Sequence, residues 1–281
     1  MRAAAVQLNS TADKARNLAT AERLVRAAAR GGATLVALPE KWNLLADSAT
    51  LLEGAEPLDG PTIGAASSWA RELGIHLVAG SIAERVEGHE KAFNTSTLIG
   101  PGGELEARYR KIHMFDVDVG GVAYRESEHE EPGDELVATR LVGELEGVAL
   151  GLTVCYDLRF PELYRILAVR GAMVMTVPSA FTLDTGKDHW EVLLRARAIE
   201  NQAFVVAPNQ IGEAPPHYRS YGRSMIVDPW GVVLGQAPDE ECFVAADLDL
   251  DAQARVRATL PSLANRRPET YRWPEHEELR V

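Results

Sequence analysis

Short apolar runs alternate with longer amphipathic stretches along most of this chain. The apolar runs are of strand length, and several carry almost no polar side chain, which is typical of strands buried on both faces of a sheet. The predicted strands of this kind span residues 1–8, 34–38, 75–80, 148–154, 172–177 and 203–207, and another strand, rich in Thr and Asn, is predicted at residues 93–99. Further strands, joined by turns into antiparallel pairs, are predicted at residues 104–110, 224–227, 232–234 and 242–247.

The amphipathic stretches repeat their apolar residues at helical spacing, so they predict helices between the strands. The first helix is expected to begin at a cap formed by Asn9, Ser10 or Thr11 and to end at Arg30. The other helices are expected to begin at Pro61, at Pro161, at Lys187 or Asp188, and near Asp249.

Two polar stretches interrupt this alternation. Residues 112–134 show little periodicity and much charge, and residues 208–221 form a polar loop; loops of such length inside a compact domain are usually functional. No linker, low-complexity segment or repeat divides the sequence. Strands alternating with helices therefore favour one mixed α/β domain over residues 1–281, with an irregular tail from about residue 260.

Composition and charge exclude several classes of protein. A net charge of −12 argues against nucleic acid or an anionic membrane as a partner. No apolar run is long enough to span a bilayer, and the apolar start of the chain is too short for the core of a signal peptide. Two cysteines, Cys155 and Cys242, make a poor disulfide framework, so a reducing cytoplasm is the expected location.

The strand predicted at residues 148–154 ends at Cys155, and a helix is expected to begin shortly afterwards at Pro161. Open α/β sheets bind their ligands at the carboxyl ends of strands, and a helix amino terminus favours a thiolate. Cys155 is therefore a candidate nucleophile. The alternative is a small buried hydrophobic side chain, which is the role of most unpaired cysteines.

Glu40 and Lys111 occupy the same kind of position, directly after predicted strands. Because the carboxyl ends of neighbouring strands meet at one rim of a sheet, we expect both residues to lie near Cys155. A cysteine nucleophile needs a base for its proton and a donor for the oxyanion. Glu40 could be that base, and Lys111 with the backbone N–H of Tyr156 that donor. Each also has an ordinary explanation, since Glu40 could cap a helix or lie in solvent and Lys111 could end an exposed strand.

Arg159 lies four residues after Cys155, near the start of the helix predicted from Pro161. There its guanidinium could receive a carboxylate of the substrate through two hydrogen bonds. A salt bridge to Asp157 or Glu162 explains the residue equally well, and the sequence leaves both explanations open.

Three segments resemble, in order, the Glu, Lys and Cys blocks of the nitrilase (carbon–nitrogen hydrolase) superfamily. These segments are residues 38–40, 109–118 and 152–162. The resemblance continues through residues 189–191, 195–201, 222–224 and 228–231. Residues 124–127 and 178–181 fit its Nit-type amidase branch, which includes deaminated glutathione amidase and the ω-amidases.

The resemblance implies a four-layer α-β-β-α sandwich that usually forms a homodimer, or a larger homo-oligomer, through helices near the active site. It supports the catalytic roles given above for Glu40, Lys111 and Cys155. It also adds Glu126 as a second acid that orients Lys111 and the substrate amide. Without the resemblance, Glu126 would be interpreted as a solvated loop carboxylate.

The same resemblance implies a pocket for the acid end of the substrate. In this branch the arginine that matches Arg159 holds that end, and Phe181 and Thr185 match positions that line the pocket. No metal or organic cofactor is expected, and the histidines show no convincing ligand spacing. Residues 211–219 match no pattern of the branch, so fine specificity stays open.

The combined expectation is a cytoplasmic amidase that hydrolyses a small carboxylate-bearing α-keto amide to an acid and ammonia through a thioester. Deaminated glutathione is favoured over α-ketoglutaramate on resemblance alone. The alternatives among enzymes are an N-carbamoyl amino acid hydrolase, another aliphatic amidase and a true nitrilase. The non-enzyme alternative is a catalytically silent scaffold with an acidic surface, and the intact set of Glu40, Lys111 and Cys155 speaks against it.

Overall fold

The computed structural model describes residues 1–214 and 218–271. Successive side chains of its first strand, β1 (Arg2–Gln7), point to opposite faces, as the pleat of a strand requires. Ala3 joins an apolar cluster shared with the second sheet, whereas Ala4 packs among the side chains of covering helices. The first sheet is therefore buried on both faces.

The first sheet has seven strands in the order β17-β1-β2-β3-β4-β5, with β8 paired to β4. β1, β2 and β3 run parallel to one another, and β17, β4 and β5 pair with their neighbours in antiparallel fashion. Its other strands are β2 (Leu35–Ala37), β3 (His76–Glu84), β4 (Ala92–Ile99), β5 (Leu105–Arg110), β8 (Glu130–Glu131) and β17 (Cys242–Asp247). β1 pairs with β17 from Arg2 opposite Asp247 to Gln7 opposite Cys242, so the first and the last strand of the described residues are neighbours in one sheet.

The second sheet has six strands in the order β16-β15-β12-β11-β10-β9. β10, β11 and β12 are parallel to one another; β9 pairs with β10, β15 with β12 and β16 with β15 in antiparallel fashion. The bounds are β9 (Ala138–Arg140), β10 (Ala149–Leu152), β11 (Val174–Thr176), β12 (Phe204–Ala207), β15 (Met225–Val227) and β16 (Val233–Gln236).

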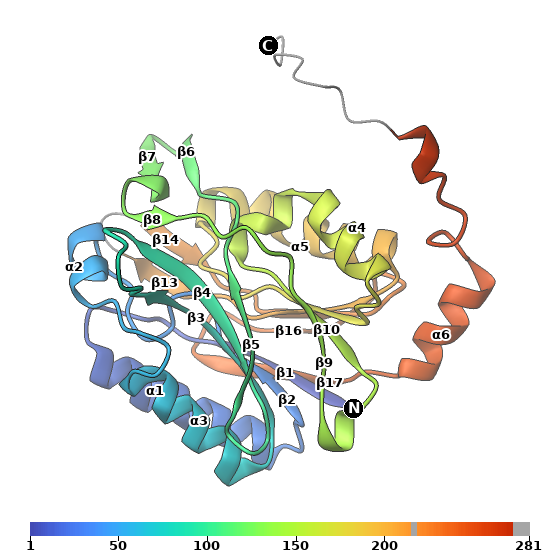
Figure 1. Ribbon diagram of the computed structural model, residues 1–281, viewed down its shortest axis with the longest axis horizontal. Coiled ribbons are helices and arrows are strands. Elements are labelled where there is room, and N and C mark those ends of the chain that lie inside the picture. Colours follow the sequence, from blue (N-terminus) through green and yellow to red (C-terminus); the bar gives the residue numbers. More distant parts are fainter. Residues whose placement is uncertain (215–217, 272–281) are drawn as a thin grey trace.

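Helices cover the outer face of each sheet (Figure 1). α1 and α3 lie against the first sheet and α4 and α5 against the second, so the layers follow in the order helix, sheet, sheet, helix. This arrangement confirms the four-layer sandwich. The helices are α1 (Lys14–Arg30), α2 (Ser48–Glu53), α3 (Pro61–Leu73), α4 (Pro161–Val169), α5 (Leu183–Asn201) and α6 (Leu250–Thr259). Within the described residues, none of them combines the length and the apolar character needed to cross a membrane.

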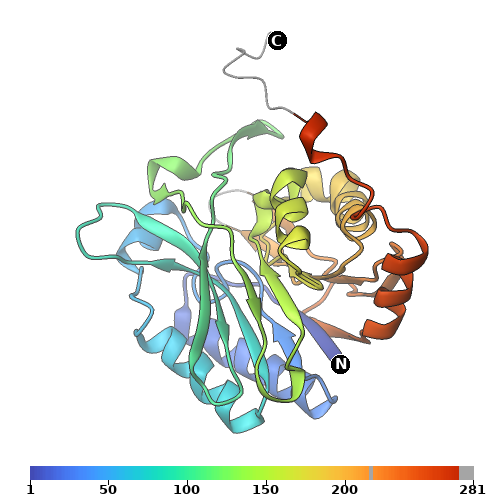
Figure 2. The same cartoon turned by 45° about the vertical axis from the view of Figure 1, so that its right-hand side comes forward.

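Both stretches predicted as polar loops contain regular structure. Residues 112–134 include the hairpin β6–β7, which projects from one end of the sandwich (Figure 2), and residues 208–221 include the hairpin β13–β14. Their bounds, with those of the 3₁₀ turns, are β6 (Asp116–Val119), β7 (Val122–Arg125), β13 (Ile211–Ala214), β14 (Tyr218–Tyr221), η1 (Glu126–Glu128), η2 (Gly143–Leu145), η3 (Cys155–Arg159) and η4 (Pro268–Thr270). Residues 215–217 of the unmatched 211–219 segment, and residues 272–281 of the expected tail, lie outside the described residues.

The cap of α1 lies later in the chain than predicted. Asp13 is the capping residue, and its carboxylate accepts a hydrogen bond from the Arg16 N–H at 3.0 Å. The three expected candidates precede the helix: Asn9 and Ser10 donate hydrogen bonds to the carbonyls of Glu213 and Trp42, and the Thr11 N–H donates to the Asn17 side chain within α1. Several residues of capping type stand close together in this part of the sequence, so the sequence alone does not identify the one that caps the helix.

α5 begins at Leu183, one helical turn before the predicted start at Lys187 or Asp188. The sequence pattern did not predict this first turn because it contains Gly186, and glycine is unfavourable inside a helix. The structure explains the glycine, since a Cβ at Gly186 would meet the side chain of Tyr221 at 2.4 Å. Close packing against β14 therefore requires glycine at position 186, and this glycine made the start of α5 hard to predict.

Candidate active site

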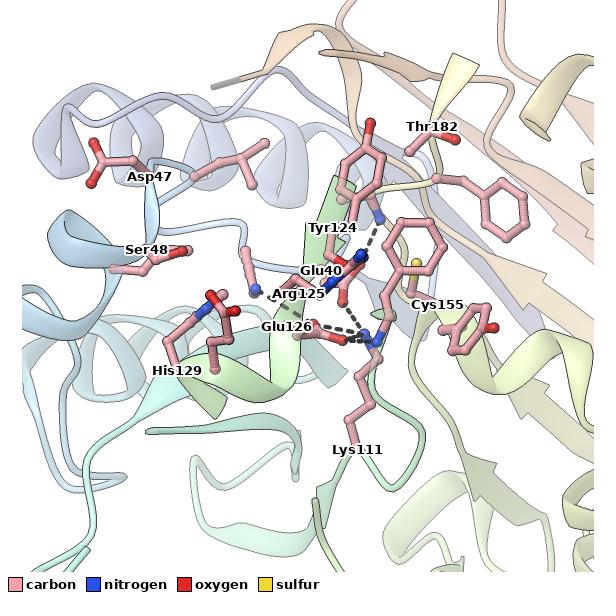
Figure 3. Close-up of a pocket in the computed structure, with 18 of the residues that line it drawn as sticks. Glu40, Asp47, Ser48, Lys111, Tyr124, Arg125, Glu126, His129, Cys155 and Thr182 are labelled. Atoms are coloured by element: carbon pink, nitrogen blue, oxygen red, sulfur yellow. Dashed lines mark hydrogen bonds and ion pairs between the residues drawn. The ribbon is translucent and has the colours of Figure 1, made fainter. Parts of the chain in front are cut away.

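The three catalytic candidates meet at one end of the sandwich, but they come from both sheets. Glu40 follows β2 and Lys111 follows β5 of the first sheet, whereas Cys155 follows β10 of the second sheet. The prediction that they share the rim of a single sheet is therefore wrong. Figure 3 shows the Lys111 side chain reaching between Glu126 and Glu40, with the Cys155 sulfur on the far side of Glu40.

Three donors hold the Glu40 carboxylate. Its Oε1 accepts hydrogen bonds from Asn94 Nδ2 at 2.8 Å and from Lys111 Nζ at 3.2 Å. Its Oε2 accepts a hydrogen bond from the Ala180 N–H at 2.8 Å. The residue is only 3% exposed. A carboxylate fixed in this way has the defined orientation that a general base needs.

Lys111 lies between two carboxylates. Besides its contact with Glu40, its Nζ donates to Glu126 Oε1 at 2.8 Å and to Glu126 Oε2 at 2.7 Å. The Phe115 N–H donates to Glu126 Oε2 at 2.7 Å. Burial alone would lower the pKa of Lys111, but Glu126 and Glu40 raise it well above its ordinary value, so the ammonium is charged. Glu126 is thus a buried partner of Lys111 rather than a solvated carboxylate.

Cys155 lies at a sharp turn between β10 and η3. Its φ is +46°, a left-handed conformation that is rare for a residue with a side chain and that clusters at functional sites. The Cys155 N–H donates to the Pro178 carbonyl at 2.9 Å, which fixes the turn. Tyr156 is in the first turn of η3, where backbone N–H groups have no acceptor within the turn itself. Its N–H is therefore available to an oxyanion that forms next to the sulfur.

Burial raises the pKa of the Cys155 thiol well above its ordinary value; the Glu40 carboxylate raises it further, while Lys111 lowers it. The resting cysteine is therefore a neutral thiol. Such a thiol becomes a nucleophile only when a base removes its proton as the new bond forms. The Glu40 carboxylate is near enough to raise the pKa of this thiol, so it is in place to act as that base.

A cavity of about 280 Å³ opens beside these groups, close to the smallest volumes found for small-molecule sites. We call its buried side the inner wall, formed by Glu40, Lys41, Lys111, Glu126 and Cys155. We call its solvent-facing side, contributed by β7 and the start of α2, the outer wall, formed by Asp47, Ser48, Ala123, Tyr124 and Arg125.

Two of the three residues expected to bind the substrate line this cavity. Phe181 and Thr185 are part of its wall, but Arg159 is not. The Arg159 guanidinium carbon lies 5.3 Å from the centre of the Phe181 ring and 5.8 Å from that of Tyr156, which also lines the cavity. Arg159 is therefore placed next to two rings of the wall.

The contacts of Arg159 test the salt bridge to Asp157 or Glu162 that the sequence left open. Its Nη1 lies 3.2 Å from His189 Nδ1. In the described part of the chain, neither Asp157 nor Glu162 forms an ion pair with it, because the Asp157 carboxylate faces His113 at 2.7 Å instead. The salt-bridge explanation of Arg159 is therefore not realised in this structure.

Sequence reasoning missed three polar side chains that belong to the inner wall or lie next to it. Asn94 donates to Glu40 and, at 3.4 Å, to Glu126. Lys41 and Glu130 lie 2.6 Å apart behind Glu126. The available signals were an amide within a buried strand for Asn94, and a cation directly after Glu40 for Lys41.

Comparison with known proteins gives consistent matches over nearly the whole chain. The family model described as carbon-nitrogen hydrolase matches residues 2–258. Deaminated glutathione amidase of Synechocystis sp. is 42% identical over 266 residues, which are 94% of this chain and 97% of the relative. Omega-amidase NIT2 of Mus musculus is 39% identical over 271 residues, 96% of each chain.

Solved structures show the same similarity. Nit3 of Saccharomyces cerevisiae, described as a member of branch 10 of the nitrilase superfamily, superposes with a TM-score of 0.85 at 30% identity, covering 96% of this chain and 97% of Nit3. A Glu-to-Gln mutant of the amidase from Nesterenkonia sp. AN1 superposes with a TM-score of 0.80 at 28% identity, covering 96% and 94% of the two chains. That structure carries the acetamide moiety of fluoroacetamide covalently bound to the active-site cysteine.

Proposed function

The chain belongs to the carbon–nitrogen hydrolase family and is a hydrolase that acts on carbon–nitrogen bonds, and on this premise we propose that it is a cysteine-dependent amidase. The proposed substrate is a small amide with a carboxylate and an α-keto group. One observation carries the proposal: Glu40, Lys111 and a neutral, buried Cys155 thiol converge at a cavity of small-molecule size.

In the first half of the proposed reaction, the Cys155 sulfur attacks the amide carbon while its proton passes to Glu40. Lys111 Nζ and the Tyr156 N–H stabilise the oxyanion that forms. The carbon–nitrogen bond then breaks, Glu40 returns the proton to the departing nitrogen, and the acid part remains bound to sulfur as a thioester.

In the second half, a water molecule attacks the thioester carbonyl and gives a proton to Glu40. The same two donors, Lys111 and the Tyr156 N–H, stabilise the second oxyanion. The carbon–sulfur bond breaks, Glu40 returns the proton to the Cys155 sulfur, and the free acid leaves. Glu126 keeps the Lys111 ammonium charged and oriented through both halves.

Arg159 is the proposed receptor for the acid end of the substrate, with Phe181 and Thr185 as neighbours on the wall. A protein of net charge −12 repels an anionic substrate, so selection of a carboxylate needs a local cation. Arg159 supports this role because it lies against two cavity-lining rings, those of Phe181 and Tyr156, and has no carboxylate partner in the described part of the chain.

Two substrates fit this description, and they differ in the leaving group. Deaminated glutathione is favoured, because the Synechocystis relative carries that name, and its hydrolysis releases cysteinylglycine. α-Ketoglutaramate, an ω-amide, releases ammonia and corresponds to the name of the Mus musculus relative. Both leave 2-oxoglutarate as the acid product.

Release of 2-oxoglutarate therefore tests both substrates with one readout, and release of ammonia distinguishes them. The panel adds an N-carbamoyl amino acid, a neutral aliphatic amide and an aliphatic nitrile, with Cys155→Ala as the blank. The largest kcat/KM is expected for deaminated glutathione. A larger kcat/KM for the carbamoyl compound, the neutral amide or the nitrile would show that the enzyme acts on that class of compound instead. No turnover of any compound by the wild type would favour the silent scaffold.

We also propose that the protein acts in the cytoplasm as a homodimer, each chain forming one domain with an irregular tail from about residue 260. Both cysteines are free, which suits a reducing compartment. The outer helices α4 and α5 leave apolar side chains exposed, namely Ile166, Val169, Val192 and Ile199. Light scattering after size-exclusion chromatography measures the assembly, and a monomer at all concentrations would contradict the dimer.

A further inference from the structure

Lys41 combines an unusual backbone with an unusual environment for a lysine. Its φ is +52°, in the left-handed region that side chains disfavour. Its side chain is 10% exposed, and its Nζ lies 2.6 Å from Glu130 Oε1 and 3.6 Å from Glu126 Oε1. The mechanism above uses neither Lys41 nor Glu130. A left-handed residue that carries a buried cation, directly after the general base, points to a function.

Five charged side chains alternate in sign from Glu40 to Glu130. The contacts run from Glu40 to Lys111 at 3.2 Å, from Lys111 to Glu126 at 2.7 Å, from Glu126 to Lys41 at 3.6 Å and from Lys41 to Glu130 at 2.6 Å. Each of the five side chains is 10% exposed or less. Glu126 is the middle member, so it has a cation on either side. With all five ionised, three carboxylates face two ammonium groups, and one proton makes the set neutral.

That proton belongs on Glu130. Burial raises the pKa of Glu130 to about 8; Lys41 and Lys111 oppose the rise and Glu126 adds to it. Burial would also raise the pKa of Glu126, but Lys111 and Lys41 hold it below its ordinary value. His129, the remaining titratable neighbour, is neutral at pH 7, because burial and the charge of Lys41 lower its pKa to about 4. At neutral pH the protonated Glu130 therefore faces an ionised Glu126, and no net charge is buried.

We propose that Lys41 and Glu130 are positioning residues that hold Glu126, and through it the Lys111 ammonium, at the place where the oxyanion forms. This inference rests on the proposed function, because it takes Lys111 as an oxyanion donor. Lys41 also lines the cavity, so a direct contact with the acid end of the substrate is the alternative. The position of its Nζ between two carboxylates favours the positioning role.

Turnover of paired variants tests the proposal. Lys41→Met and Glu130→Leu remove the polar contacts with little change in volume, and each is expected to lower kcat roughly 10- to 100-fold. Their KM is expected to change by less than about threefold, because no substrate contact is lost. Lys41→Arg keeps the charge and recovers most of the lost kcat. Glu131→Gln is the matched control, since the next carboxylate of the strand pairs with His89 at the surface and its removal leaves kcat unchanged.

The pH profile provides a readout that a merely structural role does not change. Glu130→Gln mimics the protonated carboxyl, so its kcat at pH 7 stays within about threefold of the wild type. Above about pH 8 the wild-type Glu130 ionises and repels Glu126, so kcat falls. Glu130→Gln is expected to lack that fall. The same alkaline fall in both proteins would overturn the proposal.

Alkylation of Cys155 separates this inference from the proposed function, because it needs no substrate. In a Cys242→Ser background, Lys41→Met is expected to slow the reaction with iodoacetamide by about tenfold, since a displaced Lys111 stabilises the thiolate less. A wild type that hydrolyses nothing refutes the function and leaves this test intact. The inference is overturned if folded Lys41→Met and Glu130→Leu show the same kcat and the same alkylation rate as the wild type. It is also overturned if only their KM changes. If circular dichroism shows either variant unfolded, the pH profile of Glu130→Gln decides.

Discussion

The inner and outer walls of the cavity both contain ion pairs, but they hold them under opposite conditions. On the inner wall, Lys111 lies 1% exposed between Glu40 and Glu126. On the outer wall, Arg125 pairs with Asp118 at 2.9 Å while their side chains are 42% and 73% exposed. Water screens the exposed pair, which contributes roughly 1 kcal/mol or less. Breaking a buried pair leaves a charge without a partner and costs about 3–5 kcal/mol.

The comparison separates the chemistry of the site from the selection of its substrate. The inner wall is built on strand ends that the packed sheets fix in place. The outer wall depends on the β6–β7 hairpin, whose turn is formed by Gly120 and Gly121 with φ of 62° and 78°. A surface hairpin of this kind tolerates substitution. Changes on the inner wall are therefore expected to abolish turnover, and changes on the outer wall to alter which amide is used.

The largest effect is expected from Cys155→Ala. Loss of the nucleophile should abolish hydrolysis of every amide in the panel, while the fold and the assembly stay as in the wild type because only one buried sulfur is removed. Turnover assays, circular dichroism and light scattering measure the three properties. Retained turnover in a sample free of wild-type enzyme would sink the mechanism.

The next largest effect is expected from Glu40→Gln. Glutamine is nearly isosteric but cannot accept a proton, so kcat should fall at least ~100-fold while the protein stays folded. Glu128→Gln is the matched control, because Glu128 is an exposed glutamate of the same cavity. Its kcat should match the wild type. An equal loss of kcat in the two variants would show that Glu40 is no more important for turnover than an exposed glutamate of the same cavity.

Arg159→Ala tests a residue that lies next to two rings of the wall without lining the cavity itself. Loss of a charged hydrogen bond should lower kcat/KM for the acidic amide by about 10- to 100-fold. A neutral amide of the same length should scarcely be affected. If both substrates lose equally, Arg159 only supports the rings of Tyr156 and Phe181, and the specificity claim fails.

Arg125→Ala probes the outer wall alone. The exposed pair with Asp118 is worth roughly 1 kcal/mol at most, so KM should change about fivefold or less. kcat should stay at the wild-type value, because Arg125 touches none of the reacting groups. A loss of kcat comparable to that of Glu40→Gln would show that the hairpin takes part in the chemistry.

Apart from these effects on turnover, thermal stability is expected to depend on pH through Glu130. Its folded pKa of about 8 lies above the ordinary 4.5, so the folded state holds a proton that the unfolded state releases. The resulting stabilisation is complete below about pH 4.5 and is lost as pH rises towards 8. The Tm of the wild type should therefore fall relative to Glu130→Gln over this range. If the difference in Tm between the wild type and Glu130→Gln does not change with pH, Glu130 does not carry the proton.

The sequence was sufficient to find Cys155, Glu40 and Lys111, because each follows directly on a run that is apolar or alternating. It could not show that they belong to two sheets, since strand pairing depends on contacts far apart in the chain. Glu126 follows no such run, as it lies in a 3₁₀ turn after a hairpin. Only the resemblance to a family identified it.

Asn94 and Glu130 illustrate a different limit. Asn94 is one polar residue in a predicted strand that is rich in threonine, and nothing local distinguishes it from its neighbours. Glu130 stands in an acidic stretch, and only the tertiary structure, in which β8 pairs with β4, shows that it lies next to Lys41. Side chains that act through other side chains leave a signal in the tertiary structure and not in the sequence pattern.

The pairing of β1 with β17 gives the protein an order of assembly. Every proposed catalytic group has been synthesised once Cys155 and Tyr156 leave the ribosome, yet β1 has no partner on its outer side until residues 242–247 follow. Synthesis of the roughly 90 residues in between takes about 5–20 s, during which the sheet that carries Glu40 presents an unpaired edge. A chain truncated before β17 therefore carries every proposed catalytic group but leaves one edge of its first sheet open and prone to pair with other chains.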